Sequence, residues 1–155
     1  MNDPRTSYAA LLLRIGLGAM FITHSLWLKL FVFTLPGTAQ FFVSIGLPPQ
    51  LAYLVFAAEA IGGVALILGI ATRQVALALL PILLGAVWAH AGNGWLFTNK
   101  NGGWEYPLFL TLATGVQALL GSGAYALRLG RYRATQPPQT GNTWPTKQLA
   151  DSLHR

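Results

Sequence analysis

Three side chains that could transfer protons or bind a ligand interrupt the apolar stretches of this sequence: His24, Glu59 and His90. A charged group in a stretch long enough to cross a bilayer costs at least a few kcal/mol unless it is protonated or paired, so each is a functional-site candidate. A histidine ordinarily has a pKa of about 6.5, so its imidazole can both give and take a proton. The three groups could relay protons, hold a ligand or bind a metal ion.

The composition is that of a membrane protein. The 155 residues are 54% hydrophobic and 9% charged, with a mean hydropathy of +0.50, whereas soluble domains carry about 25% charged residues. The absence of Cys excludes thiol redox chemistry, Cys-ligated iron–sulfur clusters and structural disulfides. The formal net charge is +6, but five of the ten Lys and Arg residues lie from Arg128 onward. The basic residues therefore indicate membrane topology and not nucleic-acid binding.

The hydropathy pattern predicts the elements that hold these residues, an all-α bundle of four transmembrane helices. The expected spans are about residues 8–33, 51–71, 75–96 and 105–127. The segment from Thr34 to Gln50 is uncharged, contains several Pro and Gly residues, and is too short to span a bilayer. We therefore expect a short interfacial or re-entrant helix between spans one and two.

One membrane domain is expected over residues 8–128. A short cytoplasmic lead, residues 1–7, precedes it, and a basic cytoplasmic tail, residues 129–155, follows it. The tail is rich in Pro, Thr and Gln, so we expect it to be partly disordered. Between spans two and three we expect a tight polar turn at residues 72–74, and Pro81 predicts a kink in span three.

Four spans place both chain termini on one side of the membrane. The Lys residues of the membrane domain, Lys29 and Lys100, lie toward the other side. The Arg residues on the side of the termini are Arg5, Arg73, Arg128, Arg131 and Arg133. Because basic residues accumulate on the cytoplasmic side of membrane proteins, we expect both termini in the cytoplasm.

His24, Glu59 and His90 fall at similar depths in three different spans. At a rise of 1.5 Å per residue, His24 lies about 24 Å along span one and Glu59 about 12 Å from the outer end of span two. His90 comes late in span three, so we expect all three in the outer half of the bundle, around one outward-facing polar pocket. The further ligand-binding candidates, with Trp95 nearby, are Lys29, Trp27, Trp88, Trp104 and Glu105.

The ionisable candidates also have structural interpretations. Glu59 could be a protonated acid that hydrogen-bonds a neighbouring helix, and His24 and His90 could be neutral core histidines. Lys29 and Glu105 lie near the outer surface, where they could form a solvated ion pair of little energetic weight.

Other residues are expected to act in topology or packing. The tryptophans could form an aromatic belt at the membrane surface. Arg14, alone in the inner half, is expected to extend its stem toward the cytoplasm. Gly62 and Gly63 could let another helix pack closely near Glu59, or could face a ligand.

The chain resembles the DoxX family of small four-helix membrane proteins over about residues 8–128. The order of the matching motifs makes the resemblance specific. These motifs are Arg14 with Gly16 and Gly18; His24 with Lys29; Ala39-Gln40-Phe41-Phe42 with Gly46-Leu47-Pro48; Ala58-Glu59 with Gly62-Gly63; Gly69 with Thr72-Arg73; His90; Gly102-Gly103-Trp104-Glu105-Tyr106; and Gly121-Ser122-Gly123-Ala124-Tyr125-Ala126-Leu127. The chain departs from the family at Leu127-Arg128, where relatives often have Leu-Asp.

The resemblance implies a four-helix bundle in the bacterial cytoplasmic (inner) membrane. Relatives in the family are associated with membrane redox work, as a subunit of a thiosulfate:quinone oxidoreductase and as a membrane partner of superoxide-detoxifying proteins. Partners expected from the sequence are the lipid bilayer, a redox partner subunit and, through the Gly faces, a second copy of the chain.

Three functions fit the predicted pocket. In the first, the chain is an oxidoreductase component that acts on or next to a quinone. His24 and His90 would be proton donors, and Glu59 would orient one of the histidines or relay protons. The chain has no Cys and no nucleotide-binding Gly motif, so a partner subunit or bound cofactor would supply the electrons. In the second, the same three residues bind a metal ion, or the site holds a haem. In the third, the protein is a non-enzymatic ligand- or lipid-binding protein, transporter or scaffold.

Overall fold

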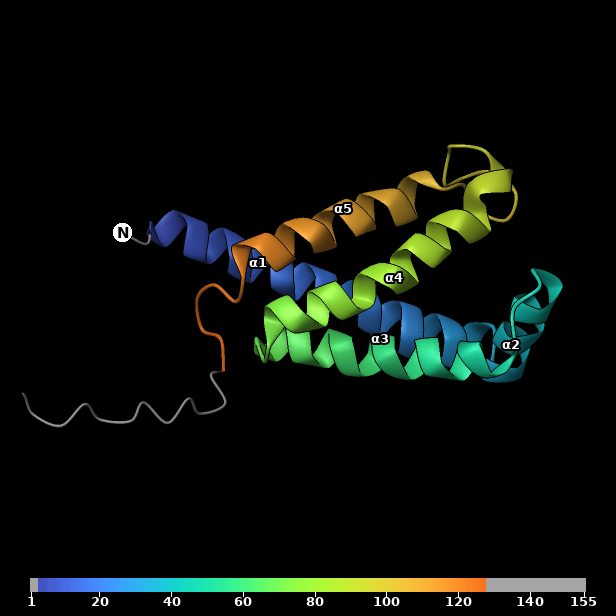
Figure 1. The fold of residues 1–155 in the computed structure, drawn as a ribbon, viewed down its shortest axis with the longest axis horizontal. Coiled ribbons are helices and arrows are strands. Elements are labelled where there is room, and N and C mark those ends of the chain that lie inside the picture. Colours follow the sequence, from blue (N-terminus) through green and yellow to red (C-terminus); the bar gives the residue numbers. More distant parts are fainter. Residues whose placement is uncertain (1–2, 128–155) are drawn as a thin grey trace, which may run out of the picture.

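The described part of the chain is all-helical. In a computed structural model of the chain, residues 3–127 are described, and no strand occurs among them. The predicted tail, residues 129–155, lies outside this range. In chain order the helices are α1 (Pro4–Ile22), the π-helix η1 (Thr23–Val32), α2 (Leu35–Ser44), α3 (Gln50–Leu68), α4 (Thr72–His90), the 3₁₀-helix η2 (Ala91–Asn93) and α5 (Glu105–Leu120) (Figure 1). The predicted all-α class is confirmed.

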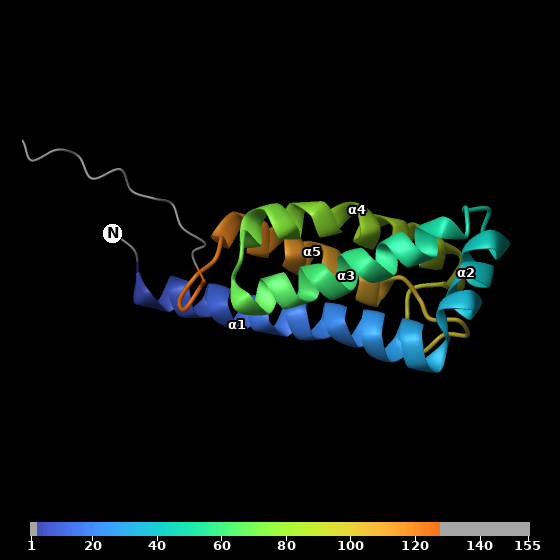
Figure 2. The ribbon, with the colours of Figure 1, turned by 90° about the horizontal axis from the view of Figure 1, so that it is seen from below.

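Four long helical segments run side by side as an antiparallel bundle, and α2 lies across one end of it (Figures 1 and 2). The segments are α1 with η1, α3, α4 and α5. The start of α1, the turn between α3 and α4, and the end of α5 lie at the opposite end (Figure 1). We call this the terminal end and the other the α2 end. Both ends of the described chain therefore lie at one end of the bundle, as the predicted topology requires.

Three helical segments are long and apolar enough to cross a membrane: Pro4–Val32, Gln50–Leu68 and Thr72–Asn93. Helix α5 has 16 residues, so it is about 24 Å long, shorter than the roughly 30 Å hydrocarbon core of a bilayer. Of the predicted fourth span, residues 105–127, only residues 105–120 are helical. Gly121 and Gly123 adopt φ angles of 78° and 67°, which end the helix after Leu120.

The first helix begins earlier than predicted. It starts at Pro4, and the Asp3 carboxylate accepts a hydrogen bond from Arg5 N at 2.9 Å. This is an N-cap followed by Pro at the first helical position, both of which favour a helix start. Most of the predicted lead, residues 1–7, is therefore helical.

The connection between α3 and α4 also differs from the prediction. Gly69 ends α3 in the left-handed conformation, with a φ of 76°, and Ala71 follows with a φ of 43°. The predicted polar turn at residues 72–74 is wrong, because these residues form the first turn of α4. Helix α4 ends at His90, before the predicted position 96.

The four segments share one apolar core. Each contributes at least one buried side chain, so the bundle is held by contacts among all of them. The core residues are Leu17, Phe21, Leu66, Leu79, Leu83 and Leu110.

Close packing of α1 on α3 depends on two glycines that face each other. A Cβ atom added to Gly18 would lie 2.7 Å from the Gly63 carbonyl oxygen, and one added to Gly63 would lie 2.9 Å from the Gly18 carbonyl oxygen. A Cβ atom at Gly62 would lie 3.0 Å from the Leu79 side chain of α4. The helix-packing interpretation of Gly62 and Gly63 therefore accounts for both residues.

Candidate functional site

A π-helix positions two of the candidate residues. In η1 the backbone bonds run from residue i+5 to residue i, and this pattern closes with Phe33 N donating to Leu28 O at 2.8 Å. In an α-helix, His24 and Lys29 would point about 140° apart, because each residue turns the helix by about 100°. A π-helix turns less per residue, so residues five apart lie near the same face. Both side chains line the same cavity, and π-helical segments occur frequently at functional sites.

This cavity has a volume of about 1110 Å³ and lies at the α2 end, between η1, α2, the start of α3 and the second half of α4. It is as large as the largest common small-molecule sites, which span about 300–1,000 Å³. The polar residues that line it are His24, Lys29, Thr38, Ser44, His90, Asn93 and Asn101. The apolar residues that line it include Leu28, Phe33, Phe41, Phe42, Leu51, Leu54, Val55, Pro81, Ile82, Ala86 and Ala89.

The carboxylate in the apolar helix α3 has a cationic partner. Lys29 Nζ donates a hydrogen bond to Glu59 Oε2, and the side chains are 17% and 8% exposed. The predicted surface pair of Lys29 with Glu105 is therefore wrong, because η1 turns Lys29 toward α3. The interpretation of Glu59 as a protonated acid bonded to a neighbouring helix gives way to an ion pair.

The two histidines are each fixed through Nδ1. His24 Nδ1 lies 2.8 Å from the Met20 carbonyl oxygen, and His90 Nδ1 lies 3.0 Å from the Gly102 carbonyl oxygen. A carbonyl oxygen can only accept, so Nδ1 carries the hydrogen in both rings. Nε2 is therefore the nitrogen that remains to exchange a proton or meet a ligand.

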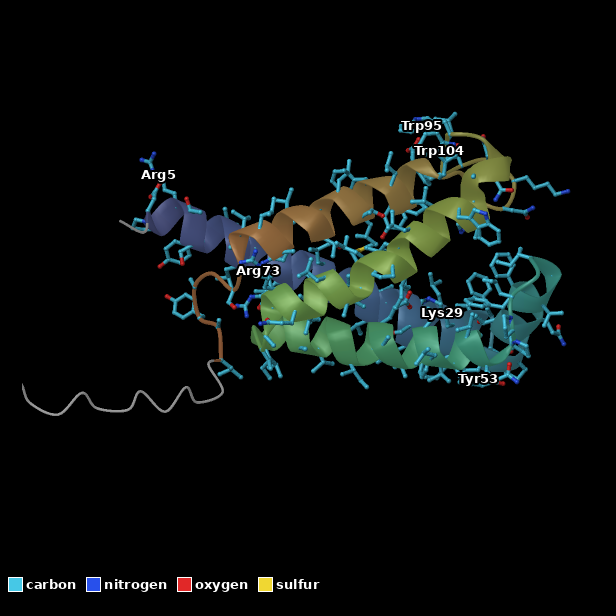
Figure 3. The ribbon with its side chains drawn as sticks, viewed as in Figure 1. Arg5, Lys29, Tyr53, Arg73, Trp95 and Trp104 are labelled. Carbon is cyan, nitrogen blue, oxygen red and sulfur yellow. The ribbon has the colours of Figure 1, made fainter. Side chains whose placement is uncertain are left out.

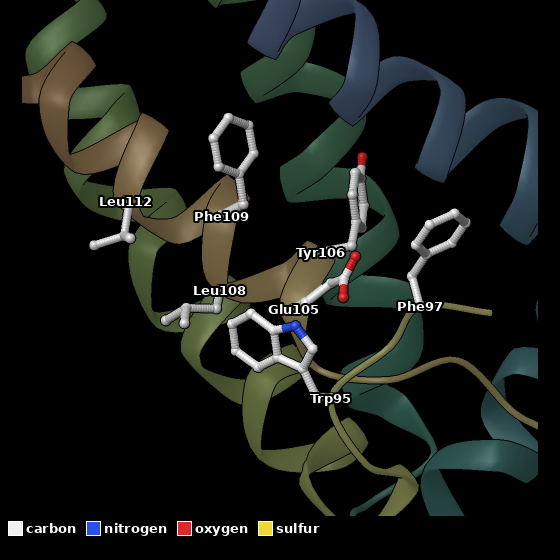
Figure 4. A pocket seen from close by; sticks show the side chains of 7 residues that line it. All are labelled: Trp95, Phe97, Glu105, Tyr106, Leu108, Phe109 and Leu112. Carbon is white, nitrogen blue, oxygen red and sulfur yellow. The ribbon is translucent and has the colours of Figure 1, made fainter. Parts of the chain in front are cut away.

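A tyrosine not singled out by the sequence supports His24. The Tyr106 ring stacks on the His24 ring, with centroids 5.5 Å apart and an interplanar angle of 17°. Tyr106 also lines a smaller hollow of about 500 Å³, together with Trp95, Phe97 and Glu105 (Figure 4). The His24–Tyr106 stack therefore stands between the two hollows.

The structure brings His24, Lys29 and His90 to one cavity and attaches Glu59 through Lys29. It does not gather the three expected metal ligands. Among residues 3–127, no three His, Asp or Glu side chains lie close enough to hold a metal ion. The metal alternative on His24, Glu59 and His90 thus lacks its ligand set.

The tryptophans divide into two kinds. Trp27 and Trp88 are 61% and 58% exposed and do not line the cavity, so their positions fit the aromatic-belt interpretation. Trp95 and Trp104 pack edge to face, with centroids 4.4 Å apart, at the α2 end (Figure 3). Glu105, the first residue of α5, lines the smaller hollow, and neither Trp104 nor Glu105 lines the large cavity.

The Arg14 guanidinium reaches toward the terminal end, as the predicted extension of its stem requires, but it is enclosed by protein there. It is 1% exposed, and its Nη2 donates to the Ala124 carbonyl oxygen at 3.1 Å. Its guanidinium fits against Gly69, where an added Cβ atom would lie 1.7 Å from Nη1. The segment after α5 covers this end of the bundle, because Ala124 N donates to Ser7 O and Leu127 N donates to Leu68 O.

Sequence reasoning missed Tyr106 and four polar lining residues: Thr38, Ser44, Asn93 and Asn101. The only available signals were the position of Tyr106 beside Glu105 and the polar composition of the loop after α4. Thr38 and Ser44 could not be found, because a hydroxyl on a short helix carries no signal until the helix is docked.

The fold and the apolar helices define a class, a helical multi-pass integral membrane protein. The chain belongs to the DoxX family, whose model matches residues 9–92. It is 46% identical over 117 residues to the Bacillus subtilis (strain 168) protein named "Putative oxidoreductase CatD", a match that covers 76% of this chain and 82% of that protein. No solved structure matches the chain. The predicted family is confirmed.

Proposed function

We propose that this protein is the membrane component of a redox system and that its cavity binds a quinone. The observation that carries the proposal is the cavity of about 1110 Å³, which combines apolar walls with His24, Lys29 and His90. A quinone requires an apolar slot for its ring and tail and hydrogen-bond donors for its two oxygens. The name of the Bacillus subtilis relative, an oxidoreductase, supports the redox assignment.

The side chains of the cavity can hold the ring and move protons. Lys29 donates hydrogen bonds to a ring oxygen, while Glu59 stabilises the ammonium in apolar surroundings. His24 and His90, fixed through Nδ1, exchange protons at Nε2. When bound, the quinone supplies the electron-accepting group. A redox partner subunit supplies the electrons, since the chain contains no Cys for a thiol or iron–sulfur carrier.

We place the protein in the bacterial inner membrane with both termini in the cytoplasm. Arg5 and Arg73 lie toward the terminal end of the bundle, whereas Lys29 lies toward the α2 end (Figure 3). The positive-inside rule then orients the terminal end to the cytoplasm. The cavity and α2 would face outward, and a second copy could pack on the lipid-facing surface.

Binding of a short-chain quinone to the purified full-length protein in nanodiscs tests the proposal. We expect saturable binding in the wild type and up to about tenfold weaker binding in His90→Ala, since a hydrogen bond contributes about 0.5–1.5 kcal/mol. Leu119→Ala, which changes an 80% exposed side chain on α5, is the matched control and should bind like the wild type. Absence of saturable binding in the wild type would overturn the quinone assignment.

A non-enzymatic role in ligand or lipid binding or transport is the second candidate. The same cavity favours it, because none of the residues that line it is itself an electron carrier. This role predicts that Glu59→Gln alters ligand binding or assembly without changing any redox rate. A quinone-reduction rate that falls in Glu59→Gln when the partner subunit is present would exclude it.

A further inference from the structure

The charged groups on the cavity wall have one sign. Lys29, His24 and His90 line the cavity, and no carboxylate does. Glu59 bonds to Lys29, but its buried side chain does not line the cavity. Among the other described acids, Asp3 caps α1 at the terminal end and Glu105 lines the smaller hollow. The ionisable side chains that a ligand meets in the cavity are therefore all basic, beside neutral hydroxyl and amide groups.

Lys29 has donors to spare. An ammonium group carries three N–H donors, and among residues 3–127 its hydrogen-bond partner is Glu59 alone. Burying a charge costs free energy that each further hydrogen bond reduces. The remaining donors call for an acceptor that the ligand can bring.

We infer that the cavity selects amphiphiles whose head group carries an acidic oxygen, either an ionised hydroxyl or a carboxylate. This inference rests on the ligand cavity of the proposed function and adds the chemical class of its occupant. The acidic oxygen lies against Lys29 on the side away from Glu59. The apolar body lies along Phe41 and Phe42 of α2 and Ile82 of α4.

The arrangement around Lys29 favours an anionic head over neutral or cationic ones. An amine would place a second cation beside Lys29 with Glu59 as the one carboxylate partner among the described residues to balance both charges, in a medium of low dielectric. A neutral ketone would accept one hydrogen bond, whereas an ionised oxygen accepts several and forms stronger, charge-assisted bonds. His24 lies on the same face of η1, so its imidazole, once protonated at Nε2, adds a second donor to the same oxygen.

Two matched pairs of ligands test the inference on the full-length protein in phosphatidylcholine nanodiscs. The first pair is hydroxynaphthoquinone, an anion at neutral pH, and methylnaphthoquinone, which is neutral. The second pair is dodecanoate and dodecanol. We expect the acidic member of each pair to bind about tenfold more tightly after subtraction of binding to empty nanodiscs, as charge-assisted hydrogen bonds require. The preference should persist in Lys29→Arg and disappear in Lys29→Met.

The single Lys29→Met variant leaves Glu59 unpaired and could fail to fold. The double variant Lys29→Met with Glu59→Gln removes both charges together and should fold, bind the neutral ligands and show no preference for the acids. Equal binding within both pairs in the wild type, or a preference that survives in the double variant, would refute the inference. If dodecanoate binds with the expected preference and neither naphthoquinone binds, the quinone assignment fails while this inference stands.

Discussion

The two ends of the bundle each hold a largely buried basic side chain, and the surroundings of the two side chains differ. At the terminal end, Arg14 is enclosed by the backbone of Gly69 and bonded to the Ala124 carbonyl oxygen. At the α2 end, Lys29 is paired with the Glu59 carboxylate and borders a large cavity. Among residues 3–127, Arg14 keeps two buried nitrogens, Nε and Nη1, without a hydrogen-bond partner, whereas Lys29 has a carboxylate partner and open space beside it.

The packing of the helices follows the same division. Gly18 and Gly63 allow α1 and α3 to come into backbone contact. By contrast, a Cβ atom added to Gly85, on the part of α4 that lines the cavity, would meet nothing within 4 Å. Interiors are normally close-packed, so added volume should be costly at the first pair and tolerated at the second position.

The largest effect is expected at Gly69. A Cβ atom there would overlap the Arg14 guanidinium and lie 2.7 Å from Ala126 Cα, in a residue whose φ of 76° already disfavours side chains. Gly69→Ala should lose roughly 4 kcal/mol of folding free energy or fail to fold, measured by denaturant unfolding in detergent. Gly16→Ala, where a Cβ atom meets nothing within 4 Å, is the control. Equal stability of the two variants would show that the close fit of Arg14 against Gly69 does not stabilise the terminal end.

The next effect tests the ion pair at the α2 end. Glu59→Ala leaves the Lys29 ammonium without its carboxylate and should destabilise the fold by about 3–5 kcal/mol, measured by the same unfolding assay. Adding Lys29→Met should recover much of this loss, because the uncompensated charge is removed. If Glu59→Ala has the same free energy of unfolding as the wild type, the Lys29–Glu59 pair does not stabilise the folded state.

A smaller loss is expected at the contact of α1 with α3. Gly63→Ala would place a Cβ atom 2.9 Å from the Gly18 carbonyl oxygen and 2.8 Å from the Ile22 side chain. Overpacking of this kind costs about 1–3 kcal/mol, visible as a lower unfolding midpoint. Gly115→Ala on α5, with nothing within 4 Å of the added Cβ atom, should be at least as stable as the wild type. An unchanged unfolding midpoint in Gly63→Ala would show that α1 and α3 can move apart without loss of stability.

The smallest effect on stability should come from filling the cavity. Gly85→Leu adds a side chain where a Cβ atom meets nothing within 4 Å and where a glycine is a poor helix former, so the fold should lose no stability. The affinity for a short-chain quinone should nevertheless fall about tenfold, because the side chain occupies the ligand space. Gly115→Leu, outside the cavity, is the matched control. Unchanged affinity in Gly85→Leu would place the ligand elsewhere.

Residue types and spacing were sufficient for the fold class, the antiparallel order of the helices and the family. Long apolar runs separated by Gly- and Pro-rich segments permit few other structures in a bilayer, where the backbone must satisfy its own hydrogen bonds. The positions where the helices end were harder to predict from the sequence. Gly69 and Gly121 act through left-handed φ angles, and a sequence does not reveal which of its 17 glycines adopt them.

Three of the eight candidate residues that the sequence singled out line the large cavity, and their contacts were not predictable. His24, Lys29 and His90 were singled out because ionisable groups are rare in apolar helices, and all three line one cavity. The partners of Glu59 and Arg14 were not predictable. Lys29 reaches Glu59 because η1 is a π-helix, and Arg14 is covered because the segment after α5 folds back on Ser7 and Leu68.

The sequence by itself determined that this protein is a helical bundle in a membrane, since the hydrophobic effect and backbone hydrogen bonding act on composition and local pattern. The tertiary structure alone decided which charges meet and where space remains. Coulomb interactions depend on distance, and distances between helices are set by how glycines, turns and side chains pack. That packing closes the terminal end around Arg14 and leaves the cavity beside Lys29 at the α2 end.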